Sequence, residues 1–185
     1  MFYEKNKNIF NIFVLILSVA VNVNASENSI LVEEWDISAT EEDKVVAKLY
    51  SDNTFTISGS GNVKDYETLG GNPWEEKGIT KVIIEEGVNN IENCMFRYCK
   101  DLKNIVISES VCSIGDNAFD NCNNLIEINI PNSVMEIVLC AFRGCTRLTS
   151  IIIPENITRI ENHTFAMCNT LNNITLPDGL QYIGI

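Results

Sequence analysis

Apolar side chains recur with a fixed 23-residue period in the C-terminal part of the chain. Five aliphatic columns keep this period, and their first members are Ile79, Val82, Ile84, Val88 and Ile91. Phenylalanine and cysteine form two further columns: Phe96, Phe119, Phe142 and Phe165, and Cys99, Cys122, Cys145 and Cys168. Such a period is typical of a solenoid, in which each unit buries its apolar face against its neighbour. The pattern predicts a stack of coils over residues 79–185, with the last repeat incomplete.

Each repeat contains the spacing Leu-x-x-Ile-x-Ile, which predicts a short strand. In one copy, Ile128 and Ile130 lie on one face and Asn129 on the other, because successive side chains of a strand alternate. Pro131 follows and ends the strand, since proline has no N–H to donate to a ladder. A second extended piece, "SVMEI" in this copy, leads into the next Phe-x-x-Cys.

The segment Ala-Phe-x-x-Cys predicts one helical or 3₁₀ turn per repeat. Phe119 and Cys122 are three positions apart, so they fall on one side of such a turn. Together these elements predict an α/β, mostly β, solenoid with 23-residue repeats.

Residues 26–78 do not share the period and predict a small β-rich N-terminal cap. The stretches "WDISA", "KVVAKLY" and "TFTISGSGNV" are rich in residues that favour strands, and "SDN" between the last two suits a hairpin turn. Trp35 and Trp74 are candidates to cover the first coil. A linker is expected around Gly70 to Pro73.

Gly59 and Gly61 could be read as part of a phosphate-binding loop. No Lys-Ser or Lys-Thr pair follows them and no helix is expected there, so a bend or bulge is the better interpretation.

Residues 1–25 have the features of a secretory signal peptide. Lys5 and Lys7 precede an apolar run from Ile9 to Val21, and small residues near Ala25 suit a signal peptidase. This run is short for a membrane span, but an uncleaved membrane anchor is the alternative. No second apolar run of this kind follows, so the mature chain is expected to have no membrane span.

The charge of the mature chain argues against nucleic acid as a partner. Without residues 1–25, 11 basic and 24 acidic residues remain, a formal charge of −13. Nucleic-acid binding depends on Lys and Arg that neutralise phosphate, and an acidic surface also disfavours anionic membranes.

The repeated pattern F-x-x-C-x-x-L-x-x-I-x-I-P-x-x-V-x-x-I resembles the BspA-type leucine-rich repeat family of secreted and surface proteins, over about residues 79–185. The resemblance implies a right-handed leucine-rich-repeat solenoid that binds other macromolecules, and it brings no catalytic residues. Two repeats depart from the pattern. The unit at Ile79 lacks a preceding Phe-x-x-Cys, and the unit at Leu171 stops before its own. We therefore expect an open last coil, left by a fragment or covered by a partner.

Seven cysteines cannot all pair with one another. The four periodic ones are expected as buried free thiols, with bridges between neighbouring coils as the alternative. Cys94 and Cys140 are two coils apart and too distant for a direct bridge, and Cys112 is expected at the surface.

No residue pattern indicates a metal, a cofactor or an enzyme. The Cys-x₄-Cys spacings lack the partner residues of zinc sites, and His163, the only histidine, has no evident thiol or carboxylate partner. The expected position of His163 is the surface.

The outward face of the stacked strands is the candidate binding surface, because its side chains are not used by the core. By alternation it carries Lys81, Ile83, Asn104, Val106, Glu127, Asn129, Ser150, Ile152, Asn173 and Thr175. Grouped exposed apolar residues mark interaction surfaces, although the β-propensity of an open sheet is an equally good explanation here.

Two functions follow from these observations. The first is a secreted or cell-surface module of the adhesion type that binds a protein or glycan. The second is a structural spacer, or a piece of a longer repeat array, with no ligand of its own.

Overall fold

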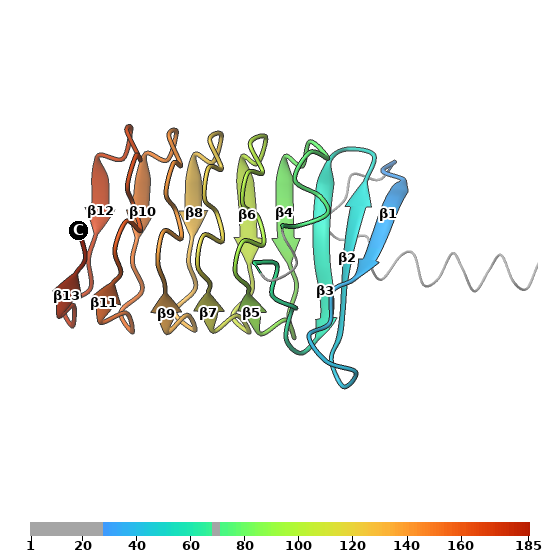
Figure 1. The fold of residues 1–185 in the computed structure, drawn as a ribbon, viewed down its shortest axis with the longest axis horizontal. Coiled ribbons are helices and arrows are strands. Elements are labelled where there is room, and N and C mark those ends of the chain that lie inside the picture. Colours follow the sequence, from blue (N-terminus) through green and yellow to red (C-terminus); the bar gives the residue numbers. More distant parts are fainter. Residues whose placement is uncertain (1–27, 68–70) are drawn as a thin grey trace, which may run out of the picture.

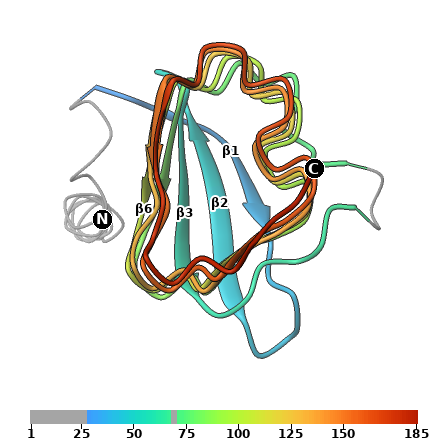
Figure 2. The same cartoon turned by 90° about the vertical axis from the view of Figure 1, so that its left-hand side faces the viewer.

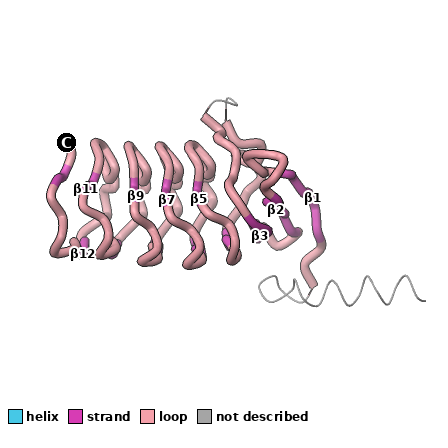
Figure 3. Tube along the Cα trace, turned by 90° about the horizontal axis from the view of Figure 1, so that it is seen from below, coloured by secondary structure: helices cyan, strands magenta, loops and turns pink. Residues whose placement is uncertain are grey.

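The computed structural model describes residues 28–67 and 71–185, and within them it contains thirteen strands and no helix (Figures 1 and 3). The predicted signal peptide lies outside the described residues. The strands are β1 (Leu31–Asp36), β2 (Lys44–Tyr50), β3 (Thr54–Ser60), β4 (Lys81–Ile84), β5 (Asn90–Ile91), β6 (Asn104–Ile107), β7 (Ser113–Ile114), β8 (Glu127–Asn129), β9 (Glu136–Ile137), β10 (Ser150–Ile152), β11 (Arg159–Ile160), β12 (Asn173–Thr175) and β13 (Tyr182–Ile183).

From residue 79 onward the chain is a solenoid with two strands per coil, and the coils superimpose when viewed along its axis (Figure 2). The longer strands β4, β6, β8, β10 and β12 form one side, and the two-residue strands β5, β7, β9, β11 and β13 form another (Figure 1). Paired strands are parallel and one sequence period apart, as in Ile151 opposite Ile128 and Ile114 opposite Ile91. The predicted mostly-β solenoid is confirmed.

The N-terminal strands continue the solenoid sheet. β1, β2 and β3 are antiparallel to one another, and β3 then pairs in parallel with β4, so a single five-stranded sheet has the order β1-β2-β3-β4-β6. Asn53, in the predicted turn between β2 and β3, adopts φ 62° and donates its N–H to the Tyr50 carbonyl. Gly59 has φ 117°, and a Cβ there would lie 1.8 Å from the Lys44 carbonyl oxygen, so close backbone approach requires glycine.

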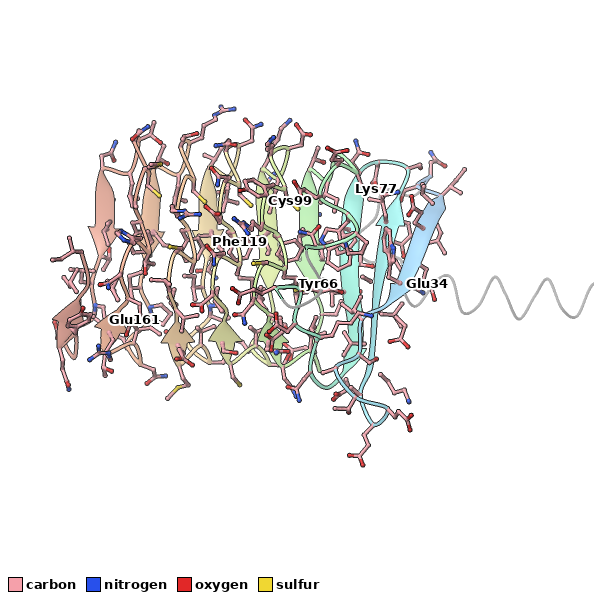
Figure 4. The ribbon with its side chains drawn as sticks, in the orientation of Figure 1. Glu34, Tyr66, Lys77, Cys99, Phe119 and Glu161 are labelled. Carbon is pink, nitrogen blue, oxygen red and sulfur yellow. The ribbon has the colours of Figure 1, made fainter. Side chains whose placement is uncertain are left out.

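The core of the solenoid contains a column of phenylalanine rings. The centroids of Phe119, which is labelled in Figure 4, and Phe142 are 5.3 Å apart, and the flanking pairs with Phe96 and Phe165 are 5.5 and 5.7 Å apart. The rings of each pair are within 14° of parallel. Since a constant repeat length places the same side chain at the same point of each coil, the periodic sequence produces this column.

The N-terminal aromatic residues close the column at its first coil. Phe55 of β3 meets Phe96 edge-on, with ring centroids 6.3 Å apart, and Trp74 packs on Phe55 at 4.9 Å. Trp35 packs against both Phe55 and Trp74. The indole N–H of Trp74 donates to the Met95 carbonyl at 2.9 Å. Trp74 therefore contacts the first coil directly, whereas Trp35 packs on Phe55 and Trp74.

The segment expected as a linker is packed against the first coil. Asn72 is only 7% exposed, and its side-chain amide donates to the carbonyls of Cys94 and Arg97, each at 3.2 Å. The Met95 and Arg97 carbonyls are therefore bound by Trp74 and Asn72, whereas the equivalent carbonyls of Ala118 and Asp120 accept N–H groups of the preceding coil. Asn72 belongs to the packed structure, and Gly70 lies outside the described residues.

The turn at Ala-Phe-x-x-Cys is not a helix. Cys122 donates its N–H to the carbonyl of Phe119 at 3.1 Å, as a three-residue turn requires, but the N–H of Phe119 donates to Ala141 of the next coil. Asn117 and Asn121 on either side adopt φ values of 55° and 60°. These left-handed residues direct alternate N–H groups toward the next coil, so consecutive helical hydrogen bonds cannot form. The predicted helical or 3₁₀ turn is wrong in this respect.

The periodic cysteines are free thiols, as predicted. The thiols of Cys122, Cys145 and Cys168 each donate to a phenylalanine carbonyl of the preceding coil, at 3.1 to 3.3 Å. Cys94 and Cys140 are also buried and free, and Cys112 is exposed.

Candidate functional site

The outward side of the long strands presents most of the predicted binding residues to solvent. Alternation turns Ile105 and Ile107 of β6 into the core and leaves Asn104 and Val106 outside. The same alternation exposes the predicted residues of the following long strands, namely Glu127, Asn129, Ile152, Asn173 and Thr175. Lys81 and Ser150 are half-buried. We call this surface the strand face.

Ile83 does not belong to the exposed strand face. Only 3% of its surface is accessible, so the prediction that Ile83 meets solvent is wrong. The parallel register places it between Thr56 of β3 and Val106 of β6, and Thr56 is itself only 4% exposed. Ile83 lies on β4, an interior strand of the five-stranded sheet, where the N-terminal strands join the solenoid.

Val106 and Ile152 are the exposed apolar residues of the strand face. They are 54% and 63% accessible, and both lie at the same position of their repeats. Asn129 of β8 lies between them in sequence order, so they are two coils apart, a separation of about 10 Å at the usual strand spacing. The two aliphatic groups are surrounded by amide, hydroxyl and carboxylate side chains of Asn104, Glu127, Asn129, Ser150 and Thr175. Such a mixture can bury small apolar contacts while polar groups form hydrogen bonds around them.

Acidic residues flank the strand face where the long strands end. Glu86, Glu109, Glu155 and Asp178 occupy the same position of four repeats and are all exposed. The N–H of Glu109 donates to the Glu86 carboxylate at 3.2 Å, so neighbouring coils are also connected along this edge. This edge accounts for part of the negative charge of the chain.

The opposite edge carries an ion-pair cluster that was missed in the sequence analysis. Asp120 is completely buried and accepts hydrogen bonds from Arg97 of the preceding coil and Arg143 of the following one. Arg97, Asp120 and Arg143 occupy the same position of three successive repeats. An alternation of charge within one repeat column was the signal that could have revealed the cluster.

The thiols and the histidine do not form a catalytic arrangement in the described residues. Burial raises the pKa of the Cys122 and Cys145 thiols well above their ordinary value, and it raises that of Cys168 to about 11. A nucleophilic thiol needs the opposite shift and a base beside it. His163 is exposed, as expected, and the described residues contain no group of three potential metal ligands.

No helix among the described residues has the length and apolar character needed to cross a membrane.

The coils, with one long and one short strand in each repeat, define a leucine-rich repeat protein. A sequence profile of the BspA-type leucine-rich repeat region matches residues 67–185 in six copies. The chain belongs to the BspA-type leucine-rich repeat family. The profile begins ahead of the predicted start of the solenoid at residue 79, in the segment that contains Asn72 and Trp74.

Three solved bacterial structures share the fold. A leucine-rich repeat protein from Eubacterium ventriosum has a TM-score of 0.65 and 24% identity, over 84% of this chain and 40% of its own. A leucine-rich repeat protein from Bacteroides ovatus has a TM-score of 0.66 and 23% identity, over 83% of this chain and 43% of its own. A leucine-rich cell surface protein from Faecalibacterium prausnitzii has a TM-score of 0.59 and 26% identity, over 86% of this chain and 46% of its own.

This chain spans less than half the length of these three proteins. Comparison with curated protein sequences gives no significant match.

Proposed function

We propose that this chain is a secreted or cell-surface, non-catalytic module of the adhesion type that binds a protein through the strand face. The exposure of Val106 and Ile152 among polar side chains carries the proposal. A monomeric surface normally leaves such residues scattered, whereas here both lie at one repeat position on the outward side of the coils, Val106 in the five-stranded sheet and Ile152 in the sheet β12-β10-β8. The description of the Faecalibacterium prausnitzii relative as a cell surface protein supports the proposed location.

The rigidity of the coils suits recognition. Parallel ladders join Ser150 to Glu127 and Asn173, and the side chains of the strand face therefore have fixed spacing before a partner arrives. Binding a preorganised surface loses less conformational entropy than binding a flexible loop.

The test uses proteins extracted from the surface and matrix that surround the source cells. The chain is immobilised, a captured protein is identified and purified, and its Kd is then measured with the double variant Val106→Ser and Ile152→Ser. We expect a weakening of about tenfold, which corresponds to about 1.4 kcal/mol. A matched double variant, Met135→Ser and Leu139→Ser, changes two other exposed apolar residues outside the strand face and leaves the Kd unchanged.

An equal weakening of binding in the two double variants would exclude the strand face as the binding surface. A glycan is the second ligand class for the same face, and binding that is lost after deglycosylation of the captured protein would assign it.

A structural spacer is the second candidate function. The chain spans 40–46% of the length of the longer solved relatives, which favours a part of a longer array. The spacer predicts that no partner is captured at micromolar concentrations of the chain.

A further inference from the structure

The turns that precede the long strands carry most of the positive charge of the solenoid. They form a row along the upper edge in Figure 1, and they occupy residues 97–103, 120–126, 143–149 and 166–172. We call them the turn strip. Five of the seven Lys and Arg residues between 79 and 185 lie in it, compared with two of the twelve Asp and Glu residues. The strip is therefore a basic surface on a strongly acidic chain.

The basic side chains of the turn strip converge on one coil. Arg97 reaches forward and Arg143 reaches back to Asp120, with nitrogen–oxygen distances of 3.2, 2.9 and 2.7 Å. Arg147 also reaches back and donates to the Asn124 side chain at 3.0 Å, and Asn124 in turn donates to the Lys100 carbonyl. Three arginine side chains from the two flanking coils thus contact the turn 120–124, and the backbone of Lys100 lies beside Asn124 of the same turn.

Asp120 positions the two arginines without neutralising the group. Its carboxylate carries one negative charge and is buried, whereas the arginine side chains remain about a third exposed, at 37% and 34%. Asn121 donates to the same carboxylate at 2.8 Å. Hydrogen bonding to Asp120 raises the pKa of Arg143 further above its ordinary value. The guanidinium groups are therefore held, charged and still accessible, as binding of an external anion requires.

The surface between these cations is made of amides. Asn121, Asn123 and Asn124 occupy the central turn. The side-chain amide of Asn123 donates to the Gly144 carbonyl and that of Asn124 to the Lys100 carbonyl, while the Asn124 side-chain oxygen accepts from Arg147. Amide oxygens accept hydrogen bonds from hydroxyl groups. The backbone N–H of Asn121 already donates to Arg143 of the next coil, so this turn has no open strand edge for an extended peptide.

We propose that the turn strip binds an acidic polysaccharide, whose carboxylate or sulfate groups pair with Arg97, Arg143, Lys100 and Arg147. Its hydroxyl groups bond the intervening asparagines. The overall negative charge of the chain opposes such binding only weakly, because exposed charges farther than about 8 Å are screened at physiological salt. The site is independent of the strand face.

The test measures binding of the chain to a sulfated polysaccharide (heparin) and a carboxylated one (polygalacturonate) at about 50 mM salt. We expect binding to at least one of them, with a Kd that rises steeply with salt concentration. The double variant Lys100→Ser and Arg147→Ser should raise this Kd about tenfold, because it removes two exposed cations that are not part of the buried ion pair.

A matched double variant, Lys44→Ser and Arg159→Ser, removes the same charge from exposed residues outside the turn strip and should change the Kd less than about twofold. Equal weakening by both variants would overturn the proposal, and so would absence of binding to both polysaccharides. Polyglutamate is the peptide control. If it binds as tightly as the polysaccharides and depends on the same residues, the assignment to a polysaccharide is wrong.

Discussion

Asp120 and Arg143 form a two-point ion pair across neighbouring coils, with Nε 2.9 Å from Oδ1 and Nη2 2.7 Å from Oδ2. Arg97 of the coil on the other side shares Oδ2, so one buried carboxylate connects three successive coils. A charge inside an apolar stack is tolerated because each of its oxygens is hydrogen-bonded.

Replacement of Asp120 by alanine should destabilise the solenoid. The variant leaves both arginines without their partner, but these can turn toward water, so we expect a loss of roughly 2 kcal/mol in the free energy of unfolding. Urea unfolding followed by circular dichroism measures it. Asp101→Ala, an exposed carboxylate of the same turn strip, should change stability by less than about 0.5 kcal/mol. Similar losses in the two variants would show that Asp120 has no special role.

Removal of one central ring should disrupt the phenylalanine column. Phe119→Ala takes away a ring that stacks on both sides and is completely buried, and we expect a loss of about 3–5 kcal/mol. Phe165→Ala should cost clearly less, because Phe165 stacks on Phe142 alone among the described rings and is only partly buried. Unfolding by urea compares the two variants, and equal losses would contradict the stacking argument.

Replacement of a non-glycine residue in the left-handed conformation by glycine should stabilise the chain. Met167 has φ 61° and is exposed, so Met167→Gly removes steric strain without removing core packing. We expect a gain of about 1 kcal/mol, although the greater freedom of the unfolded chain offsets part of it. Asn169→Gly in the same turn, where φ is not positive, should instead lower stability by about 0.5–1 kcal/mol. Thermal unfolding measures the stability of both variants. A lower stability of Met167→Gly than of the original chain would contradict the argument that Met167 is strained.

Alkaline pH should destabilise the chain through its buried thiols. Burial raises the pKa of Cys168 from 9.0 to about 11, so the unfolded state loses this proton at a lower pH than the folded state. The contribution is fully present below about pH 9 and is lost as the pH rises toward 11.

Denaturant unfolding under reducing conditions at about pH 8 and pH 10.5 tests this dependence. Between the two pH values, the free energy of unfolding should fall less in Cys168→Ala than in the original chain. In Cys112→Ala, which changes an exposed thiol, it should fall by the same amount as in the original chain. An unchanged loss in Cys168→Ala would exclude this thiol as a source of the pH dependence.

Much of the fold could be predicted from the sequence because, in a solenoid, residues that are one repeat period apart contact each other in neighbouring coils. Ile128 and Ile151 are one period apart in the sequence and are direct register partners in β8 and β10. The local turn was harder to predict. Asn117 and Asn121 can adopt left-handed backbone, but Cys94 and Tyr98 do so at equivalent positions without any such preference, and their N–H groups donate to Asp116 and Asp120 of the next coil.

The candidate binding surface could be predicted only in part. Strand alternation correctly placed Val106 and Ile152 outside, since that rule needs no tertiary information. Ile83 has the same position in its repeat and is nevertheless buried, where β3 pairs with β4.

The order of residues was enough to establish a repeated β coil, its constant period and the side chains that line its core, because nearest-neighbour stacking makes each contact a consequence of periodicity. Only the tertiary structure decided that Asp120 binds Arg97 and Arg143 of the two flanking coils and that Trp74 closes the first coil. These contacts join residues that break the repeat or differ within its columns, and their geometry depends on the assembled stack.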